Sequence, residues 1–400
     1  MNVCFDTFGC RLNKAEALQI EAEYIAKGWR VVKKHAEADL IIVRGCSVTA
    51  RAQHECEHFI SRLRLKYPRK NIKVEGCLPN RQTHEVSVAA PKDALPTRTA
   101  RAYLKVQDGC SGQCTFCIVP QFRGKSQSVA FCDVIDRAQR FIDAGYHEIV
   151  VTGCNLSLYA SNNKRLPELI TALAELDQKC RVRLGSLEPG SCALETVSAL
   201  AEKKNACRFL HIPIQSGSPE ILRAMKRPYD IQDVENLIAR ATDLMPNLGL
   251  GCDLMTGFPS ESAARFLSSK KLLMTLPFTN AHIFPYSERP NTPAASLPQA
   301  IPSHERSHRA HELATIISTK RKKFAESFIG KDVEIIVEDK TKCIGWTSEY
   351  ISCKAFGSAP RKSLAKIRVL RRTGDQLYGQ LIQEAVNQSA GKAFKTVSTT

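Results

Sequence analysis

Residues 107–117 read Gln-Asp-Gly-Cys-Ser-Gly-Gln-Cys-Thr-Phe-Cys, and the three cysteines in this stretch have the spacing C-x3-C-x2-C. A [4Fe–4S] cluster normally takes four thiolates, one for each iron. Cys110, Cys114 and Cys117 therefore account for three irons of one cluster from a single loop. The fourth iron is left open to a small molecule that carries an amino and a carboxylate group.

S-Adenosylmethionine (SAM) carries such groups, and binding through them places its sulfonium beside the cluster. One electron then breaks a carbon–sulfur bond and yields a 5′-deoxyadenosyl radical, chemistry that the cofactor carries while the protein positions it. Such a radical is needed for C–H bonds too strong for acid–base catalysis. The alternative, zinc, needs a fourth ligand and usually paired C-x2-C knuckles. No second pair lies nearby in the sequence.

The segment from Tyr103 to about Ser287 predicts an incomplete (β/α)6 barrel, because six short apolar runs alternate with six helix-like runs. We expect strands at 103–106, 147–152, 181–185, 208–214, 248–254 and 281–285. We expect helices near 130–144, 166–177, 193–203, 218–225, 231–245 and 261–275. A long Rossmann-like sheet is the structural alternative.

Polar residues follow the predicted barrel strands, at the face where barrel active sites are built. We expect them to hold the amino acid, ribose and adenine of SAM, and we expect Phe116, at the same cofactor site, to shield the cluster from water. The candidates are Thr152, Gly153, Asn155, Ser186, Glu188, Gln215, Ser216, Asp253 and Tyr286. For each of them, a capping or turn role is the alternative.

Residues 1–90 predict an α/β domain with a parallel sheet. Apolar strands at 3–5, 39–43 and 71–74 alternate with helices at 14–27 and 52–67, and each strand runs into a Gly-Cys pair. Because ligands gather at the carboxyl ends of parallel strands, Cys10, Cys46 and Cys77 are expected to meet at one edge. Three unrelated buried cysteines are the alternative.

The rest of the chain divides into connectors and a small β-rich domain. Residues 81–100 read as a linker, and the central domain, 101–327, ends in a basic helix over about 303–327. Five short strands within 328–386 predict a small β-barrel. Residues 387–400 are expected to form a loose tail.

Charge and cysteine content restrict the possible partners and location. The net charge is +17, which suits a polyanion such as nucleic acid, with an acidic membrane surface as the second possibility. Sixteen cysteines in a chain without a visible signal peptide indicate reduced thiols in the cytoplasm. No apolar run is long enough for a membrane span.

With these features in place, the sequence resembles the methylthiotransferase family of radical SAM enzymes over about residues 1–385. The resemblance rests on four stretches. They are Gly9-Cys10-Arg11-Leu12-Asn13-Lys14-Ala15-Glu16; the three-cysteine segment with Ile118-Val119-Pro120 and Arg123-Gly124; His211-Ile212-Pro213-Ile214-Gln215-Ser216-Gly217-Ser218 with Met225-Lys226-Arg227; and Gly257-Phe258-Pro259 with Phe284-Pro285-Tyr286-Ser287 and Thr292-Pro293-Ala294.

The resemblance implies two [4Fe–4S] clusters, with Cys10, Cys46 and Cys77 as ligands of the second, and a TRAM-like RNA-binding barrel at 328–386. It implies replacement of a C–H bond by a methylthio group, with SAM, an external electron donor and a sulfur donor. The opening motif and Gly345-Trp346-Thr347-Ser348-Glu349-Tyr350 are similar to the branch that acts on tRNA. That branch converts N6-threonylcarbamoyladenosine at position 37, in the anticodon stem-loop, to its 2-methylthio form.

Other hypotheses remain open at this point. The substrate is alternatively isopentenyladenosine tRNA or a ribosomal protein, and the protein is alternatively a non-catalytic iron–sulfur RNA-binding protein. Arg123 is our candidate for neutralising the threonylcarbamoyl carboxylate, with a structural salt bridge as its alternative. We also expect that removing 328–400 weakens RNA binding and leaves SAM cleavage largely intact. The chain departs from the family's usual pattern at three places. Arg44-Gly45 precede Cys46 where the family usually has Asn-Thr, Ser260 stands where the family usually has Gly, and the stretch between Cys77 and Cys110 is shorter than usual.

Overall fold

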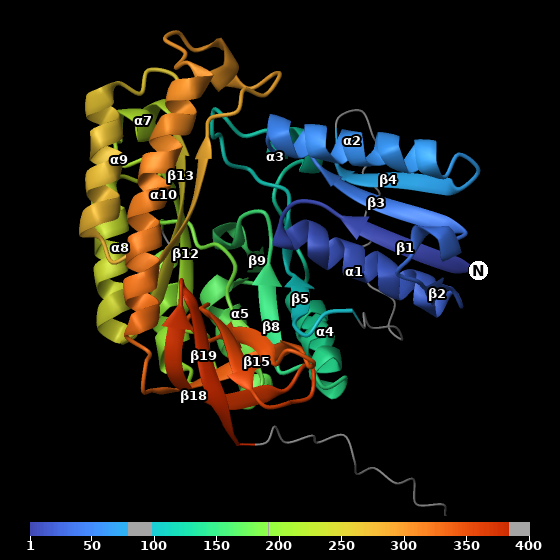
Figure 1. Cartoon of the computed structure of the whole chain (residues 1–400). Coiled ribbons are helices and arrows are strands. Elements are labelled where there is room, and N and C mark those ends of the chain that lie inside the picture. Colours follow the sequence, from blue (N-terminus) through green and yellow to red (C-terminus); the bar gives the residue numbers. More distant parts are fainter. Residues whose placement is uncertain (79–97, 191, 384–400) are drawn as a thin grey trace, which may run out of the picture.

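Three domains follow one another along the chain in the computed structural model, which describes residues 1–78, 98–190 and 192–383 (Figure 1). They are a parallel α/β domain, a six-stranded open barrel and a small closed β-barrel. The predicted fold class is therefore confirmed. Most of the predicted linker at 81–100 and the tail at 387–400 lie outside the described residues.

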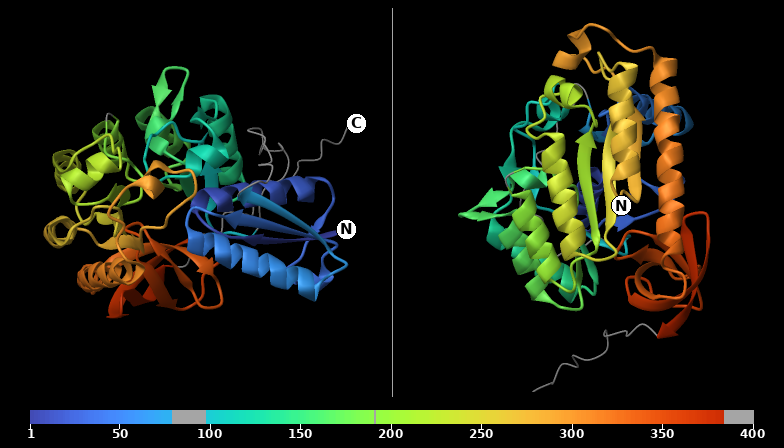
Figure 2. Two further views of the ribbon diagram at one scale, coloured as in Figure 1. Left: turned by 90° about the horizontal axis from the view of Figure 1, so that it is seen from above. Right: turned by 90° about the vertical axis from the view of Figure 1, so that its left-hand side faces the viewer.

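The N-terminal domain has one parallel sheet with helices on both faces (Figure 2). Its strand order is β2-β1-β3-β4. The elements are β1 (Asn2–Thr7), α1 (Arg11–Ala26), β2 (Arg30–Val31), a short 3-10 helix (His35–Glu37), β3 (Leu40–Cys46), α2 (Ala50–Lys66) and β4 (Asn71–Cys77). All residues of β3 are buried because helices cover both of its faces. Two short elements were not predicted, the two-residue strand β2 and the 3-10 helix.

The central domain places six parallel strands in two three-stranded sheets, β11-β8-β5 and β12-β13-β14. Isolated parallel bridges, Val182 to Ala206 and Ser186 to His211, join the sheets near β11 and β12. The strands are β5 (Ala102–Lys105), β8 (Glu148–Thr152), β11 (Arg181–Arg183), β12 (Phe209–Gln215), β13 (Gly249–Thr256) and β14 (Asn280–Pro285). All six match the predicted strands, and β5 and β14 form the edges of an open barrel.

Helices cover the outer face of this barrel, and the apolar core lies between them and the strands. They are α4 (Phe131–Asp143), α5 (Leu166–Leu176), α6 (Ala193–Glu202), α7 (Pro219–Ala224), α8 (Ile231–Leu244) and α9 (Ala263–Thr275). Three small features of this domain were not predicted. They are the short helix α3 (Val119–Arg123), the strand pair β6 (Gln107–Asp108) with β7 (Gln127–Ser128), and the strand pair β9 (Ala160–Ser161) with β10 (Lys164–Arg165). The long helix α10 (Ser303–Glu326) runs along the outside to the C-terminal domain (Figure 2).

The C-terminal domain is a closed five-stranded barrel in the order β15-β16-β17-β19-β18. Its strands are β15 (Asp332–Asp339), β16 (Ile344–Thr347), β17 (Ser352–Phe356), β18 (Leu364–Thr373) and β19 (Gln376–Gln383). Closure leaves no free sheet edge among these strands. A separate apolar core, which includes Ile335, Val337, Ile367 and Val369, fills the interior.

The turn between β16 and β17 closes the lower end of the open barrel. Arg183 on β11 is fully buried and donates hydrogen bonds to the carbonyl oxygens of Thr347 (2.8 Å) and Ser348 (3.1 Å). The Tyr350 ring lies 4.8 Å from the Phe209 ring, centroid to centroid. The C-terminal domain is thus part of the barrel floor, while the effect of removing 328–400 on SAM cleavage and RNA binding stays a prediction.

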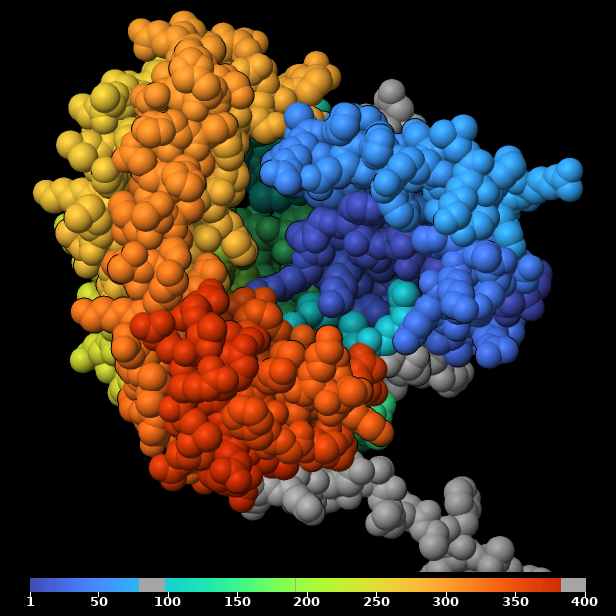
Figure 3. Space-filling view, in the orientation of Figure 1, coloured from blue at the N-terminus to red at the C-terminus, as the bar shows by residue number. Residues whose placement is uncertain are grey.

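The molecular surface has a hollow between the N-terminal domain, the C-terminal barrel and the part of the central domain that includes α10 (Figure 3). The open edge of the central barrel, at β14, faces this side (Figure 1). Within the described ranges, no helix has both the length and the apolar character needed to cross a membrane.

Candidate active site

One set of three cysteines lies at the carboxyl edge of the N-terminal sheet. Cys46 and Cys77 are paired residues at the ends of β3 and β4, and Cys10 caps α1 just beyond β1. Gly9 has φ +91°, and a Cβ atom there would lie only 2.9 Å from Cys46 Sγ. Glycine therefore lets the turn before Cys10 approach Cys46 closely. We refer to Cys10, Cys46 and Cys77 as the N-terminal triad.

The second set lies on the loop that connects β6 with α3. A Cβ atom on Gly112 would lie 3.3 Å from Cys110 Sγ and 3.9 Å from Cys114 Sγ, so both sulfur atoms point toward this glycine. The N–H of Cys117 donates to the carbonyl of Cys114 (3.1 Å), which folds the loop back on itself. We refer to Cys110, Cys114 and Cys117 as the barrel triad.

Burial favours the protonated form of these thiols, because it raises their pKa values. It raises the pKa of Cys77 to about 11 and of Cys117 to about 12, and it also raises the pKa of Cys46 and Cys114. Neighbouring thiolates raise these values further, while Arg123 opposes the effect at Cys77 and Arg227 at Cys114. Metal binding needs deprotonated thiols, so loading either triad would release protons.

The spacing of the triads distinguishes a cluster from a single ion. Two groups of three His, Cys, Asp or Glu in the described part of the chain have ligand atoms all within 4.8 Å of one another: Cys4 with Asp6 and His35, and His211 with Asp253 and His282. Neither triad is that compact. Sulfur ligands of one zinc ion lie at most twice the Zn–S distance of about 2.3 Å apart. In this ligand-free arrangement the triads are more open than three ligands of one zinc ion, and their thiolates fit a cluster in which each binds its own iron.

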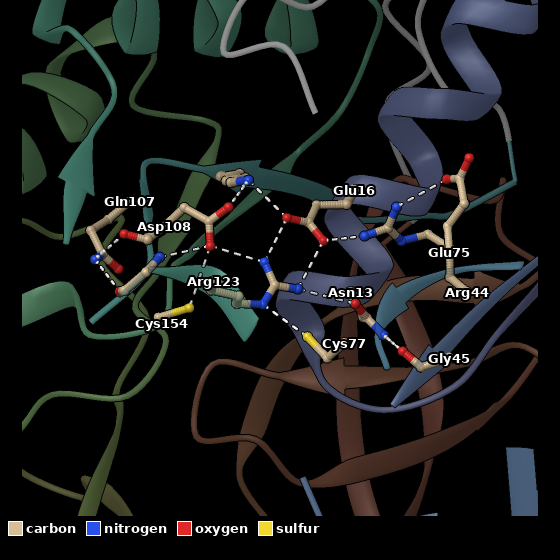
Figure 4. Close-up of polar contacts among 12 residues, drawn as sticks. Asn13, Glu16, Arg44, Gly45, Glu75, Cys77, Gln107, Asp108, Arg123 and Cys154 are labelled. Carbon is tan, nitrogen blue, oxygen red and sulfur yellow. Dashed lines mark hydrogen bonds and ion pairs between the residues drawn. The ribbon is translucent and has the colours of Figure 1, made fainter. Parts of the chain in front are cut away.

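Arg123, at the end of α3, links Cys77 of the N-terminal triad to Asp108, which precedes the barrel triad (Figure 4). Its Nε donates to Cys77 Sγ at 2.9 Å. Its Nη atoms donate to both carboxylate oxygens of Glu16 (2.8 and 3.0 Å), to Asp108 (2.9 Å) and to Asn13 (3.2 Å). Because Asp108 lies just before the barrel triad, one side chain bridges the loops that carry both triads.

Glu16 is the centre of this network and is only 1% exposed. Besides Arg123, it accepts hydrogen bonds from Arg44 (2.5 Å) and Lys105 (2.7 Å), and Arg44 also lies 3.4 Å from Glu75 (Figure 4). Burial raises the pKa of Glu16, but Arg123, Lys105 and Arg44 outweigh it and lower the pKa to about 2. The network therefore fastens α1 of the N-terminal domain to the central barrel.

The contacts of Arg123 decide between its two predicted roles. The guanidinium is already held by two carboxylates, an amide and a sulfur within the protein, which is the structural salt bridge. It is not free to neutralise a substrate carboxylate, so that hypothesis is wrong. The sequence motif located this residue but gave no sign of partners about a hundred residues away.

A second arginine has the same relation to the barrel triad. Arg227 Nη1 donates to Cys114 Sγ at 3.0 Å, and its Nη2 donates to Glu188 at 2.5 Å. Glu188 also accepts from Asn155 at 3.3 Å. Two of the residues predicted to contact SAM thus lie beside a cysteine of the barrel triad. The sequence analysis did not assign Arg227 this position.

Strand β8 and the residues after it support the loop that carries the barrel triad. The buried Gln107 side chain donates to the carbonyls of Asp108 and Gly109 (both 2.7 Å) and accepts from the Asn155 N–H (2.9 Å). A Cβ atom on Gly153 would lie 2.9 Å from Gln107 Oε1. Thr152, at the end of β8, is also buried. The geometry therefore gives Thr152, Gly153 and Asn155 a place next to the cluster loop.

Two buried polar atoms at the barrel strand ends have no partner among the described residues, namely Gln215 Oε1 and the Tyr286 hydroxyl. The Tyr286 ring packs 5.4 Å from Phe258, in an apolar group that also includes Phe116. Buried polar atoms normally have a partner, so these two fit contacts to a polar ligand. Ser216 differs, because its hydroxyl lies 3.4 Å from that of Ser269 on α9 and accepts from Ser218 N–H.

Asp253 on β13 lies between two histidines. His211 Nε2 is 3.0 Å and His282 Nδ1 is 3.1 Å from Asp253 Oδ1. Burial raises the pKa of Asp253, but hydrogen bonds from the two histidines outweigh it and lower the pKa. Ser186 is exposed and pairs with His211 through the bridge between the sheets. The sequence analysis did not single out either histidine, since their partner lies on a different strand.

Family comparisons agree with this division of the chain. Residues 104–273 match the radical SAM superfamily, and residues 2–96 match the uncharacterized protein family UPF0004. A radical SAM methyltransferase from Kitasatospora setae, TsrM, has the same fold over 74% of this chain and 75% of its own, with a TM-score of 0.54 and 14% identity.

Three curated relatives cover most of this chain and of their own length. The threonylcarbamoyladenosine tRNA methylthiotransferases MtaB of Aquifex aeolicus and Bacillus subtilis are each 26% identical, over 92% and 95% of this chain and 100% and 96% of their own. The tRNA-2-methylthio-N(6)-dimethylallyladenosine synthase of Anaplasma marginale is 27% identical over 83% of both chains. Together with a cysteine triad in each matched region, these matches support a radical SAM methylthiotransferase.

Proposed function

We propose that this protein is a tRNA methylthiotransferase that converts N6-threonylcarbamoyladenosine at position 37 to its 2-methylthio form. The observation that carries the proposal is the pair of cysteine triads, with Arg123 bonded both to Cys77 of the N-terminal triad and to Asp108 on the loop of the barrel triad. Relatives named for this activity cover 92% and 95% of the chain. Each domain has its own part in this proposal: 1–90 holds the N-terminal triad, 101–327 holds the barrel triad, and 328–386 contacts the RNA.

The barrel triad would hold a [4Fe–4S] cluster with one open iron, and the N-terminal triad would hold a second cluster. When bound, SAM and these clusters supply the radical that breaks the C–H bond and the sulfur that replaces hydrogen. The residues of the protein position SAM and shield the site from water. Arg227 and Glu188 orient one end of the SAM site, the orphaned Gln215 and Tyr286 atoms offer polar contacts, and Phe116 excludes water.

The chemistry of adenine favours such an arrangement. Its C2–H is neither acidic nor nucleophilic, so ionic catalysis has little effect there. Bases in the anticodon loop are unpaired and can be splayed into a protein pocket. Taking a base out of its stack costs a few kcal/mol, which contacts to the RNA backbone can offset. The protein would work in the cytoplasm with an external reductant and a sulfur donor.

The C-terminal barrel and α10 supply the basic surface for the RNA. Residues 303–372 contain sixteen Lys or Arg and eight Asp or Glu. Arg368 and Arg371 on β18 are exposed, and Arg371 lies 4.4 Å from the centroid of the Tyr378 ring. Exposed guanidinium and aromatic groups suit phosphate contacts and base stacking.

Mass spectrometry of tRNA nucleosides from cells with and without the protein tests the proposal. Loss of 2-methylthio-N6-threonylcarbamoyladenosine in its absence, with return on re-expression, is the expected result. Loss of the methylthio form of isopentenyladenosine, or of a modification on a ribosomal protein, would move the chain to another branch. If no methylthio group changes anywhere, the non-catalytic RNA-binding alternative gains support.

A further inference from the structure

A cavity of about 530 Å³ lies beside Cys10 of the N-terminal triad, where all three domains meet. Arg11 and Lys14 of α1 line it together with Arg98, and Tyr103 of the central barrel and Tyr350 of the C-terminal turn complete it. Its walls are set by the same α1 that Glu16 fastens to the barrel.

The cavity is positively charged. Among its described lining residues three are cationic and none is acidic. Arg98 already forms an ion pair with Glu21. Arg11 and Lys14 form no ion pair with a carboxylate within the described ranges, and the first turn of α1 holds no acidic residue. Their charge is therefore available to an anion from outside.

Aromatic rings hold both cations in place. The guanidinium of Arg11 lies 5.1 Å from the centroid of the Tyr350 ring, and Lys14 Nζ lies 4.8 Å from that of Tyr103. A cation on a ring face is attracted to it yet keeps its remaining N–H groups free for hydrogen bonds. Burial raises the pKa of Tyr350, but Arg11, Arg101 and Arg183 outweigh it and lower the pKa, which reports a positive potential here.

A guanidinium and an ammonium group next to each other suit an oxyanion, and a guanidinium can bind a carboxylate through two parallel hydrogen bonds. The proposed substrate carries one carboxylate beyond its phosphates, on the threonylcarbamoyl group. Isopentenyladenosine and adenosine carry none. Because Cys10 lines the same cavity, an anion bound there lies beside the N-terminal triad.

We propose that Arg11 and Lys14 bind the carboxylate of the threonylcarbamoyl group and thereby select this nucleoside over uncharged ones. The proposal rests on the proposed function and names the residues that read its substrate. Arg11 and Lys14 take the role that the sequence suggested for Arg123. Phosphate of the RNA backbone is the other oxyanion that the site could take, and the experiment separates the two.

The experiment measures the affinity of the reconstituted full-length protein for three fluorescent anticodon stem-loops under anaerobic conditions. The loops differ only at position 37, which carries threonylcarbamoyladenosine, isopentenyladenosine or adenosine. The variants are Arg11→Gln, Lys14→Gln, the double variant and Arg11→Lys. The matched control is Lys27→Gln, since Lys27 follows the far end of α1 and lies outside the cavity. Thermal unfolding checks that each variant is folded.

The wild type and Lys27→Gln should prefer the threonylcarbamoyl loop. Arg11→Gln and Lys14→Gln should each reduce that preference, and the double variant should lose about tenfold or more while binding the adenosine loop as before. Arg11→Lys should keep part of the preference. Equal loss for all three loops would assign the site to backbone phosphate and overturn the proposal, as would an unchanged preference. If the wild type itself shows no preference, the proposed substrate is wrong.

Discussion

Arg123 Nε lies 2.9 Å from Cys77 Sγ, and the same guanidinium binds Asp108, two residues before Cys110. One side chain therefore contacts a cysteine of the N-terminal triad and the loop of the barrel triad (Figure 4). The proposed reaction needs both triads to act on one substrate atom. A rigid connection between them keeps their separation constant, which positions groups for reaction more effectively than flexible domains would.

Arg123 should affect the reduction potential of the N-terminal cluster as well as its position. Hydrogen bonds to ligand sulfur atoms are among the factors that set the potentials of iron–sulfur clusters. In Arg123→Met we expect the potential of the N-terminal cluster to fall, because a donor to Cys77 is lost, while the iron content stays near that of the wild type. Redox titration followed by EPR measures this. Arg140→Met, on the outer helix α4, is the control. Equal potentials in Arg123→Met and the wild type would show that the hydrogen bond has no electronic effect.

Glu16 should contribute strongly to stability. Glu16→Gln would leave Arg44, Lys105 and Arg123 without their shared carboxylate, and breaking a buried charge network in this way costs about 3–5 kcal/mol. Denaturant unfolding of the apo-protein measures the loss. Glu23→Gln on the same helix, outside the network, should change the free energy of unfolding by less than about 0.5 kcal/mol. Similar effects of the two substitutions would contradict the account of the network.

The same carboxyl group predicts a pH dependence. Its pKa is about 2 in the folded protein and 4.5 as the ordinary value, so a depressed pKa stabilises the folded state above about pH 5. That stabilisation, about 3 kcal/mol, should disappear progressively as the pH falls from 4.5 toward 2. Unfolding curves between pH 7 and pH 3.5 should therefore show a steeper loss for the wild type than for Glu16→Gln. Parallel curves would place the acid sensitivity elsewhere.

Sequence and structure agree where short-range patterns decide the outcome. Apolar runs ending in Gly-Cys located β1, β3 and β4, and the spacing of Cys110, Cys114 and Cys117 indicated one loop. Contacts between distant segments were not predictable, because a side chain's partner depends on the packing of whole domains. Arg123 and Arg227 were within recognised motifs, yet neither sequence nor spacing indicated a sulfur partner. The insertion of Tyr350 into the barrel floor likewise appears only in the folded chain.

The floor contacts change how RNA binding is tested. Removing 328–400 would uncover Arg183 and Glu148, both fully buried, so we expect the truncated protein to unfold more easily and to lose SAM cleavage. Charge reversal avoids this problem. Arg368→Glu with Arg371→Glu should weaken tRNA binding and flatten its dependence on salt, since fewer counterions are released. Filter binding at several salt concentrations measures both.

Arg240→Glu, an exposed residue on α8 on the outside of the barrel, is the matched control for charge. It should leave tRNA affinity and its salt dependence near the wild-type values. If it weakens binding as much as the β18 variants do, the effect is one of net charge and the RNA does not dock on the C-terminal barrel. SAM cleavage serves as the measure of an intact active site in all of these variants.

The central claim is that two separate clusters carry out one reaction on tRNA. The most direct test is to reconstitute the wild type and a variant with Cys10, Cys46 and Cys77 changed to Ala, and to assay both with a threonylcarbamoyladenosine stem-loop, SAM and a reductant. The variant should hold about half of roughly eight irons per chain and still form 5′-deoxyadenosine. Mass spectrometry should find 2-methylthio-N6-threonylcarbamoyladenosine only with the wild type. Methylthiolated product from the variant would contradict the two-cluster account.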